Sequence, residues 1–367
     1  MAEKAIRLGG ESTAAAITQA VQELYPEHKF TEAEFARKDN AAEIAVDTNF
    51  AAQSFWKDAR IRVFRKKSAV LGLILIVVIV LLAIFGPGMN AYTYSGQDLS
   101  QKNFAPRVPG IEQFGILDGS EKMSTTTGTK IVNNYVEKGK DDVYYWFGSD
   151  LYGRDIWTRT WEGARVSLII AVAAAIIDMV IGMSYGLISG YFGGRVDMVM
   201  QRFLEVANGI PRLVIVTLLL LVLQPGMVTI IFALMLTEWV GMSRIARAEM
   251  LKLKDQEFVL ASRTLGAGSF FIIFKEVLPN IIGPIITQVM FSIPTAIFTE
   301  AFLSFVGLGI PVPQCSLGSL ISELYNSFTT HPYQIIPPIV VMSLLMLSFN
   351  LLADGLREAL DPKMKSM

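Results

Sequence analysis

Charged side chains are unevenly distributed along this chain, and their distribution limits what the chain can fold into. Of its 367 residues, 166 lie in five segments that contain only three charges: Asp178, Glu238 and Glu300. The five segments are 68–97, 166–194, 213–243, 277–322 and 324–353. The other 201 residues carry the remaining 62 charges. Charges are costly inside a bilayer and common outside it, so the pattern predicts a membrane protein that crosses the bilayer several times.

The remaining composition excludes several functions. The formal net charge is -1, so a strong basic excess for binding nucleic acid is missing. Cys315 is the only cysteine and cannot form an intrachain disulfide, and two distant histidines give no metal-ligand spacing. The nearest candidate for a phosphate-binding loop ends at Gly128-Thr129-Lys130 but has Met123 in place of its first glycine. We therefore expect no catalytic residue, no metal and no ATP site in this chain.

Six spanning helices are predicted from the apolar segments. A helix needs about 20 apolar residues to cross the bilayer, and the segment 213–243 is too long for one span. Gln224-Pro225-Gly226 is a turn signal that divides it into two antiparallel helices. The expected spans are about 68–87, 166–191, 204–223, 227–243, 280–305 and 335–353. The fold class expected is an all-α polytopic membrane protein.

The orientation follows from basic residues near the ends of the spans. Before the first span, six basic residues stand against Asp58: Lys57, Arg60, Arg62, Arg65, Lys66 and Lys67. This bias predicts a cytoplasmic N-terminus, and six crossings return the C-terminus to the cytoplasm. The long loop 88–165 is then an extracytoplasmic insert, and the loop 244–280 is cytoplasmic.

Three parts of the chain are expected from these boundaries. Residues 1–67 would be a cytoplasmic tail whose end, 51–67, lies in the membrane interface. Residues 68–356 would form the six-helix domain, and 357–367 a cytoplasmic C-terminal tail. The acidic segment 1–50 is either a solvated tail or a helix that docks on a partner.

The cytoplasmic loop has a pattern of two short helices. A helical segment, Phe258–Leu265, ends at Gly266, which can adopt a left-handed C-cap conformation. A second segment, Phe270–Leu278, is expected to stop before Pro279. The small residues Ala261 and Ser262 would let another protein approach the backbone closely. The loop is either a structural connector or a projecting contact for a partner.

This loop resembles the coupling motif of ABC-importer permeases, E-A-A-x3-G-x9-I-x-L-P. Its motif positions fall on Leu260, Ala261, Ser262, Gly266, Leu278 and Pro279. The chain departs from the motif at Leu260, at Ser262 and at Glu276, which stands where the motif has an apolar residue.

Four further segments resemble the oligopeptide/dipeptide branch of these permeases, and specifically its second membrane subunit. They are WFGSDLYGRDIWTRTWEGARVSL (146–168), RFLEVANGIPRLVI (202–215), AFLSFVGLGIPVPQCSLG (301–318) and NLLADGLREALDPK (350–363). With the loop, they occur in the order and at the topological places that the family has. The resemblance covers residues 55–90 and 146–363, leaving out the tail 1–50 and the segment 98–145.

The resemblance implies a type I ABC importer permease in a bacterial cell membrane. It implies a second permease subunit, two ATPase subunits that bind ATP and Mg, and an extracytoplasmic binding protein that delivers a peptide. The loop 257–280 would transmit ATPase movement to the spans.

Two further groups of residues are considered for function. Asp178, Glu238 and Glu300 either line a peptide pathway or make hydrogen bonds between helices. Gly153-Arg154-Asp155 is either an outer gate or binding-protein contact, or a structural turn with a local Arg–Asp pair.

Other functions remain open at this stage. The same branch includes permeases for nickel chelates or haem. An ion-driven secondary transporter would need paired half-repeats and several central ionisable groups, which are not visible here. A membrane sensor or scaffold would depend on the 1–50 tail, and an intramembrane enzyme would need a catalytic constellation that the sequence does not show.

Overall fold

Long helices dominate the computed structural model, which describes residues 55–125 and 128–360. Five helices are long and apolar enough to cross a membrane within these residues. They are Lys67–Gly88 (α5 and η1), Ile156–Phe192 (α7, η4 and α8), Met227–Leu253 (α11 and α12), Ser269–Leu308 (α14, η5, α15 and η6) and Pro332–Leu360 (η7 and α17). The predicted acidic tail, residues 1–50, lies outside the described residues.

The third predicted span is a bent pair instead of one continuous helix. Helix α9 covers Gly194–Gly209, helix α10 covers Arg212–Val222, and their axes differ by 77°. Pro211 causes the break, because a proline disfavours helical geometry in the residue before it, and Ile210 is extended with φ -81° and ψ 125°. The expectation of an unbroken helix over 204–223 was wrong. Counting the bent pair as one span gives up to six spans, the number that the sequence predicts.

The fifth span also begins earlier than the sequence predicts. The helical segment expected to stop before Pro279 instead continues through α14 (Ser269–Phe271), the π-helix η5 (Ile272–Val277) and α15 (Leu278–Leu303). Pro279 lies in the first turn of α15, where a missing N–H is tolerated best. The predicted stop at Pro279 was therefore wrong. The helix ends at Leu308, where Gly307 has a φ of 87°.

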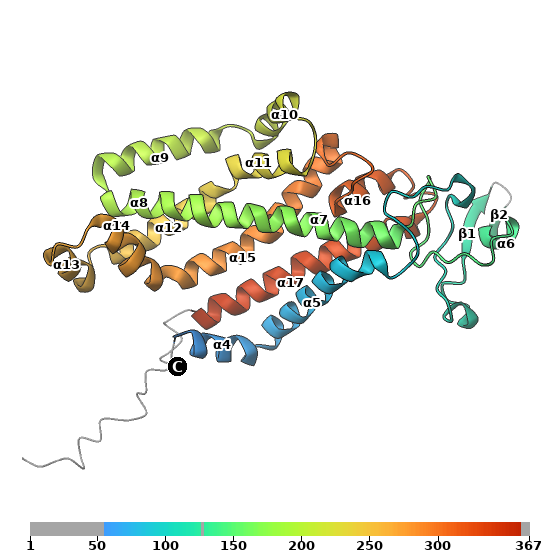
Figure 1. The fold of residues 1–367 in the computed structure, drawn as a ribbon, viewed down its shortest axis with the longest axis horizontal. Coiled ribbons are helices and arrows are strands. Elements are labelled where there is room, and N and C mark those ends of the chain that lie inside the picture. The colour runs from blue at the N-terminus through green and yellow to red at the C-terminus, as the bar shows by residue number, and fades with distance from the viewer. Residues whose placement is uncertain (1–54, 126–127, 361–367) are drawn as a thin grey trace, which may run out of the picture. The chain divides into compact units, whose positions relative to one another are not determined.

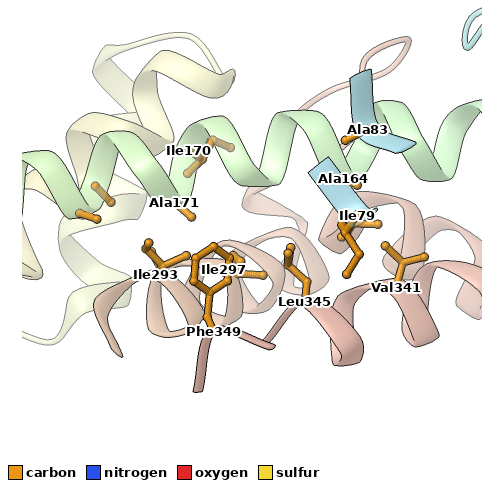
Figure 2. Packing of buried hydrophobic residues seen from close by; sticks show 14 of the residues in the cluster. Ile79, Ala83, Ala164, Ile170, Ala171, Ile293, Ile297, Val341, Leu345 and Phe349 are labelled. Atoms are coloured by element: carbon orange, nitrogen blue, oxygen red, sulfur yellow. The ribbon is translucent and has the colours of Figure 1, made fainter. Parts of the chain in front are cut away.

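The main hydrophobic core lies between four of the spans. It includes Ile79 of α5, Ile170 of α7, Ile297 of α15 and Leu345 of α17, and Figure 2 shows Ile297 and Leu345 below α7. Ile170 and Leu345 have no exposed surface. The spans are therefore held together by close packing of apolar side chains, in which dispersion contacts contribute strongly.

Glycines allow α8 (Met183–Phe192) and α12 (Trp239–Leu253) to approach closely. Gly182, Gly186 and Gly190 recur every four residues and so lie on one helix face. A Cβ atom added to Gly186 would lie 2.1 Å from the carbonyl oxygen of Ser243. Small residues at this spacing are a common basis for helix packing in membranes.

The insert between the first two spans is folded. Its strands β1 (Ser120–Thr125) and β2 (Gly128–Asn133) form an antiparallel hairpin in which Ser120 pairs with Asn133. Short helices η2 (Leu99–Gln101), η3 (Glu112–Phe114) and α6 (Asn134–Glu137) accompany the hairpin. The aromatic side chains of Phe104, Tyr135 and Tyr145 form its core. This hairpin is an addition to the helical fold that the charge pattern predicts.

The two ends of the helical bundle differ in what they carry. The hairpin lies at one end of the long helices, and α13 (Glu257–Thr264) lies at the other (Figure 1). We call these the insert end and the loop end. The described part of the interfacial segment, α4 (Phe55–Arg65), is a helix. Helix α16 (Leu317–Tyr325) packs on α7 and α15 near the insert end.

Candidate functional site

The loop-end helix α13 is closed by a glycine, as the sequence predicts. Gly266 has a φ of 84°. Its N–H donates to the carbonyl oxygen of Arg263 at 3.0 Å, and the N–H of Ala267 donates to that of Ser262 at 3.0 Å. These two bonds form a Schellman motif, which satisfies helix-end carbonyls and requires a left-handed residue. Gly266 therefore fixes the direction in which the chain leaves α13.

One apolar side chain anchors α13 to the bundle. Val259 has no exposed surface and belongs to a buried cluster with Leu187 of α8, Met250 of α12 and Ile273 of η5. Leu278 packs on the edge of the same cluster, whereas Pro279 is exposed. Helix α13 is therefore anchored in a cluster that α8, α12 and η5 also line.

The opposite face of α13 is exposed and carries apolar side chains beside Glu257 and Thr264. Leu265 is 88% exposed and Leu260 44% exposed. Ala261 is also exposed, Ser262 is half-buried, and no atom lies within 4 Å of the position that a Cβ of Gly266 would take. Apolar side chains gathered around a small-residue surface are typical of protein-contact sites. Three of the predicted loop residues, Leu260, Ala261 and Gly266, are thus available to a partner.

A second candidate site is the exposed face of α12. The exposed residues of α12 are Gly241, Arg244, Ala248 and Lys252, none of which is a large apolar residue. The exposed face of α5, in contrast, consists of Leu71, Ile74, Val78, Leu81 and Ile84. Lipid favours the side chains of α5 and disfavours those of α12. The face of α12 is therefore suited to water or protein.

The neighbouring helix α15 presents a mixed surface, in which polar residues are followed by the exposed Phe298 and Phe302. Thr295 is exposed, and Gln288 and Ser292 are half-buried. The Ser292 hydroxyl donates a short hydrogen bond to Asp178 Oδ2, while Asp178 Oδ1 is buried without a hydrogen-bond partner among the described residues. Asp178 begins the π-helix η4 (Asp178–Gly182), and π-helical turns often occur at functional sites.

Glu238 makes an ion pair at the junction of α11 (Met227–Thr237) and α12. Its Oε1 lies 2.7 Å from Nη1 of Arg212, which directly follows the break between α9 and α10. The Thr299 hydroxyl accepts a 3.1 Å hydrogen bond from the same Nη1 atom. Glu238 lies three residues before Gly241, at the start of the exposed face of α12. The ion pair therefore lies next to that face.

Glu300 has a different environment from the other two acids. It has no exposed surface, and it accepts hydrogen bonds from Ser304 at 2.7 Å, Ser167 at 3.3 Å and Ser316. Ser316 is the N-cap of α16. The described contacts of Glu300 therefore hold α16 against α7 and α15.

A buried ion-pair network lies at the insert end. Arg154 and Arg159, 3% and 0% exposed, both bind Asp150, at 2.6 Å and 2.8 Å. Both also bind Glu323 of α16, at 2.7 Å for Arg159. Burial raises the pKa of Glu323, but the charges and hydrogen bonds of the two arginines outweigh burial, so that pKa lies below its ordinary value. The network ties α16 to the start of α7.

The predicted outer residues lie in and beside this network. Arg154 pairs with Asp150 and not with its neighbour Asp155. Asp155 instead caps α7 by accepting from the N–H of Thr158 at 2.8 Å, and is 1% exposed. A Cβ on Gly153 would lie 1.8 Å from the Asp98 carbonyl oxygen.

The sequence reasoning did not single out Arg212 or Glu323. The position of each residue in the charge pattern could have identified it. Glu323 is the single charge between two charge-poor segments, 277–322 and 324–353, and Arg212 immediately precedes a third such segment. Charges at those places are candidates for ion pairs with acids inside the spans.

Comparisons with known proteins agree with one another. Residues 182–366 match the family model described as the inner membrane component of binding-protein-dependent transport systems. Residues 54–106 match the N-terminal TM domain of oligopeptide transport permease C.

Relatives of the whole chain carry similar descriptions. The oligopeptide transport system permease protein OppC of Bacillus subtilis (strain 168) is 42% identical over 85% of this chain and 91% of its own length. The dipeptide transport system permease protein DppC of the same organism is 40% identical over 85% of this chain and 87% of its own length. The OppC protein of Escherichia coli (strain K12) is 34% identical over 85% of this chain and 92% of its own length.

A solved structure of the MetNI methionine ABC transporter in inward-facing conformations also matches. It covers 54% of this chain with a TM-score of 0.47 and 15% identity.

Proposed function

This chain belongs to the family of binding-protein-dependent transport system inner membrane components, and from that premise we propose that it imports oligopeptides or dipeptides as one of two membrane subunits. It is a multi-pass membrane permease of the ABC class, and the match to oligopeptide transport permease C supports the second-subunit assignment. The peptide substrate is supported by the names of relatives at 40–42% identity.

The capped loop carries this proposal. Its exposed face, with Leu260, Ala261 and Leu265, would seat in a groove of an ATPase subunit. Its buried face, through Val259, packs into the cluster that α8, α12 and η5 share. Closure of an ATPase pair would push or pull α13, and the rigid cap at Gly266 would pass that displacement to the spans instead of absorbing it.

The exposed face of α12 would form this subunit's side of the peptide pathway. Gly241 and Arg244 of α12, with Ser292 and Thr295 of α15, offer a surface on which a hydrated peptide can move. A second permease subunit would supply the other side. Asp178 and Glu238 adjoin this surface, whereas Glu300 helps to position α16.

The remaining assignments follow from the same arrangement. Two separate ATPase subunits would bind ATP and Mg, an extracytoplasmic binding protein would deliver the peptide, and this chain would carry no catalytic residue. The loop end and both chain termini would be cytoplasmic, in line with the basic residues before α5. The insert end, including Arg154 and Glu323, would face the side from which peptide arrives.

The decisive experiment is reconstitution in proteoliposomes. This chain is combined with a second permease, two ATPase subunits and a peptide-binding protein encoded by adjacent reading frames. Uptake of labelled tri-alanine and ATP hydrolysis are then measured together. We expect uptake to require ATP and this chain, and peptide-loaded binding protein to stimulate hydrolysis. Uptake driven by an ion gradient without ATP would identify a secondary transporter and contradict the proposal.

A further inference from the structure

Arg212 is a charged residue with unused donors inside a spanning segment. Its side chain is 41% exposed, although it belongs to the bent third span. One nitrogen, Nη1, makes both of its polar contacts, to Glu238 at 2.7 Å and to Thr299 at 3.1 Å. Within the described residues, Nε and Nη2 of Arg212 donate no hydrogen bond. A guanidinium has five N–H donors, so most of its capacity is unoccupied.

Lipid is a poor neighbour for this exposed guanidinium. Arginine in a spanning segment faces a protein interior or a water-filled cavity, because lipid cannot solvate its charge. The Glu238 pairing places Arg212 beside the start of the exposed face of α12. Gly209 and Gly241, which flank the pair in sequence, have no atom within 4 Å of a potential Cβ. The surroundings of the pair therefore leave room for a ligand.

The free donors match one chemical group in particular. A guanidinium binds a carboxylate through two parallel hydrogen bonds. A linear peptide carries a carboxylate at its C-terminus. We propose that Arg212 binds the C-terminal carboxylate of the peptide during translocation, and that Glu238 and Thr299 hold the guanidinium in place. This inference rests on the proposed peptide import and specifies the chemical group recognised in the pathway.

The ion pair with Glu238 also explains how the peptide would leave. An arginine without an acidic partner would hold a carboxylate more tightly. Glu238 already neutralises part of the charge of Arg212, and this weakens the interaction with a second carboxylate. A transport site has to bind well enough to admit its substrate and weakly enough to release it. Arg212 therefore contributes selectivity for a free C-terminus without trapping the peptide.

The test compares two ligands that differ only at this end. Binding of tritiated tri-alanine and of its C-terminal amide is measured on the purified permease–ATPase complex without the binding protein, so that only the pathway discriminates. We expect wild-type complex to bind the free acid at least about tenfold more tightly than the amide. Arg212→Gln should reduce that ratio to near one, and Arg212→Lys should leave an intermediate ratio. Arg202→Gln, which breaks an exposed ion pair to Glu205 on α9, should leave the wild-type ratio unchanged.

Several outcomes would overturn the inference. Equal binding of acid and amide by the wild-type complex would do so without any variant. An Arg212→Gln complex that keeps the preference for the acid would also do so. If Arg212 instead pairs with the second permease, Arg212→Gln would weaken co-purification of that subunit, and wild type would not discriminate. Peptide uptake in reconstituted vesicles would still be observed in all three cases, whereas failure of the proposed function would abolish it.

Discussion

Replacing Gly266 by threonine is the sharpest test of the loop-end contact. At a φ of 84°, a residue with a side chain costs about 1–2 kcal/mol, and a β-branched residue costs the most. The alternative for the chain is to unwind the cap. Unwinding loses the bonds from Gly266 N–H to Arg263 and from Ala267 N–H to Ser262, at about 0.5–1.5 kcal/mol each. Strain costs about 1–2 kcal/mol and unwinding about 1–3 kcal/mol, so either route lowers the ratio of capped to uncapped loop by about fivefold or more.

A matched control lies two residues further along the chain. Gly268 has φ -70° and ψ 152°, which threonine adopts without strain, and no atom lies within 4 Å of its potential Cβ. It is also the N-cap of α14, a position at which threonine is as acceptable as glycine. Gly268→Thr therefore adds the same side chain to the same loop without disturbing α13.

The assay is peptide-stimulated ATP hydrolysis in the reconstituted complex, with assembly checked by size-exclusion chromatography. We expect Gly266→Thr to assemble, because Val259 and the core beneath α13 are unchanged, but to lose much of the stimulated rate, because the capped loop is destabilised relative to the uncapped one. Gly268→Thr should behave as wild type. Equal stimulation in the two variants would refute the idea that the rigid cap transmits movement.

Three further predictions concern other parts of the chain. Gly186→Leu should lower the melting temperature of the purified protein, because its Cβ would meet the Ser243 carbonyl oxygen at 2.1 Å and overpacking costs about 1–3 kcal/mol; Gly209→Leu, at an open site, should not. Glu323→Gln should also lower the melting temperature at neutral pH. Because the folded pKa of Glu323 is lowered, its stabilising effect is present above the ordinary glutamate pKa and is lost as the pH falls through the folded value, so wild type and variant should converge in acid; a constant difference would contradict this. Leu265→Asp should weaken co-purification of the ATPase subunits by changing an 88% exposed apolar side chain, whereas Phe114→Asp, 80% exposed at the insert end, should leave it intact.

The helical fold could be predicted because the bilayer imposes a simple rule on sequence. Apolar segments of sufficient length must be helical in lipid. The predicted spans that start at Ser68, Val166, Met227 and Ile335 therefore correspond to observed helices. Where a helix ends in apolar residues, its predicted boundary lies within several residues of the observed one. Where a helix continues into a charged segment, the prediction did not include its additional turns. Residues 156–165 continue α7 although they contain Arg159 and Arg165, because ion pairs with Glu323 and Glu162 compensate those charges.

The candidate site was only partly accessible from the sequence. Gly266 was identified because a glycine after a helical segment has a specific local meaning, and its conformation depends on few distant residues. The partners of Glu238 and Arg154 depend on residues brought together by folding. Arg212 is 26 residues from Glu238, and Glu323 is 169 residues from Arg154. No local pattern could assign those pairs.

The sequence alone therefore determined the membrane-spanning class, the approximate spans, the glycine-capped loop and the resemblance to peptide permeases. Each of these depends on local chemistry: the cost of a charge in lipid, or the backbone freedom of glycine. The tertiary structure alone decided that α9 and α10 bend by 77° at Pro211, that Arg212 meets Glu238, and that Glu300 holds α16 through serine hydroxyls. The break at Pro211 is local, but the other two features join side chains far apart in the chain, because most buried polar groups bond to partners that only the folded bundle brings close.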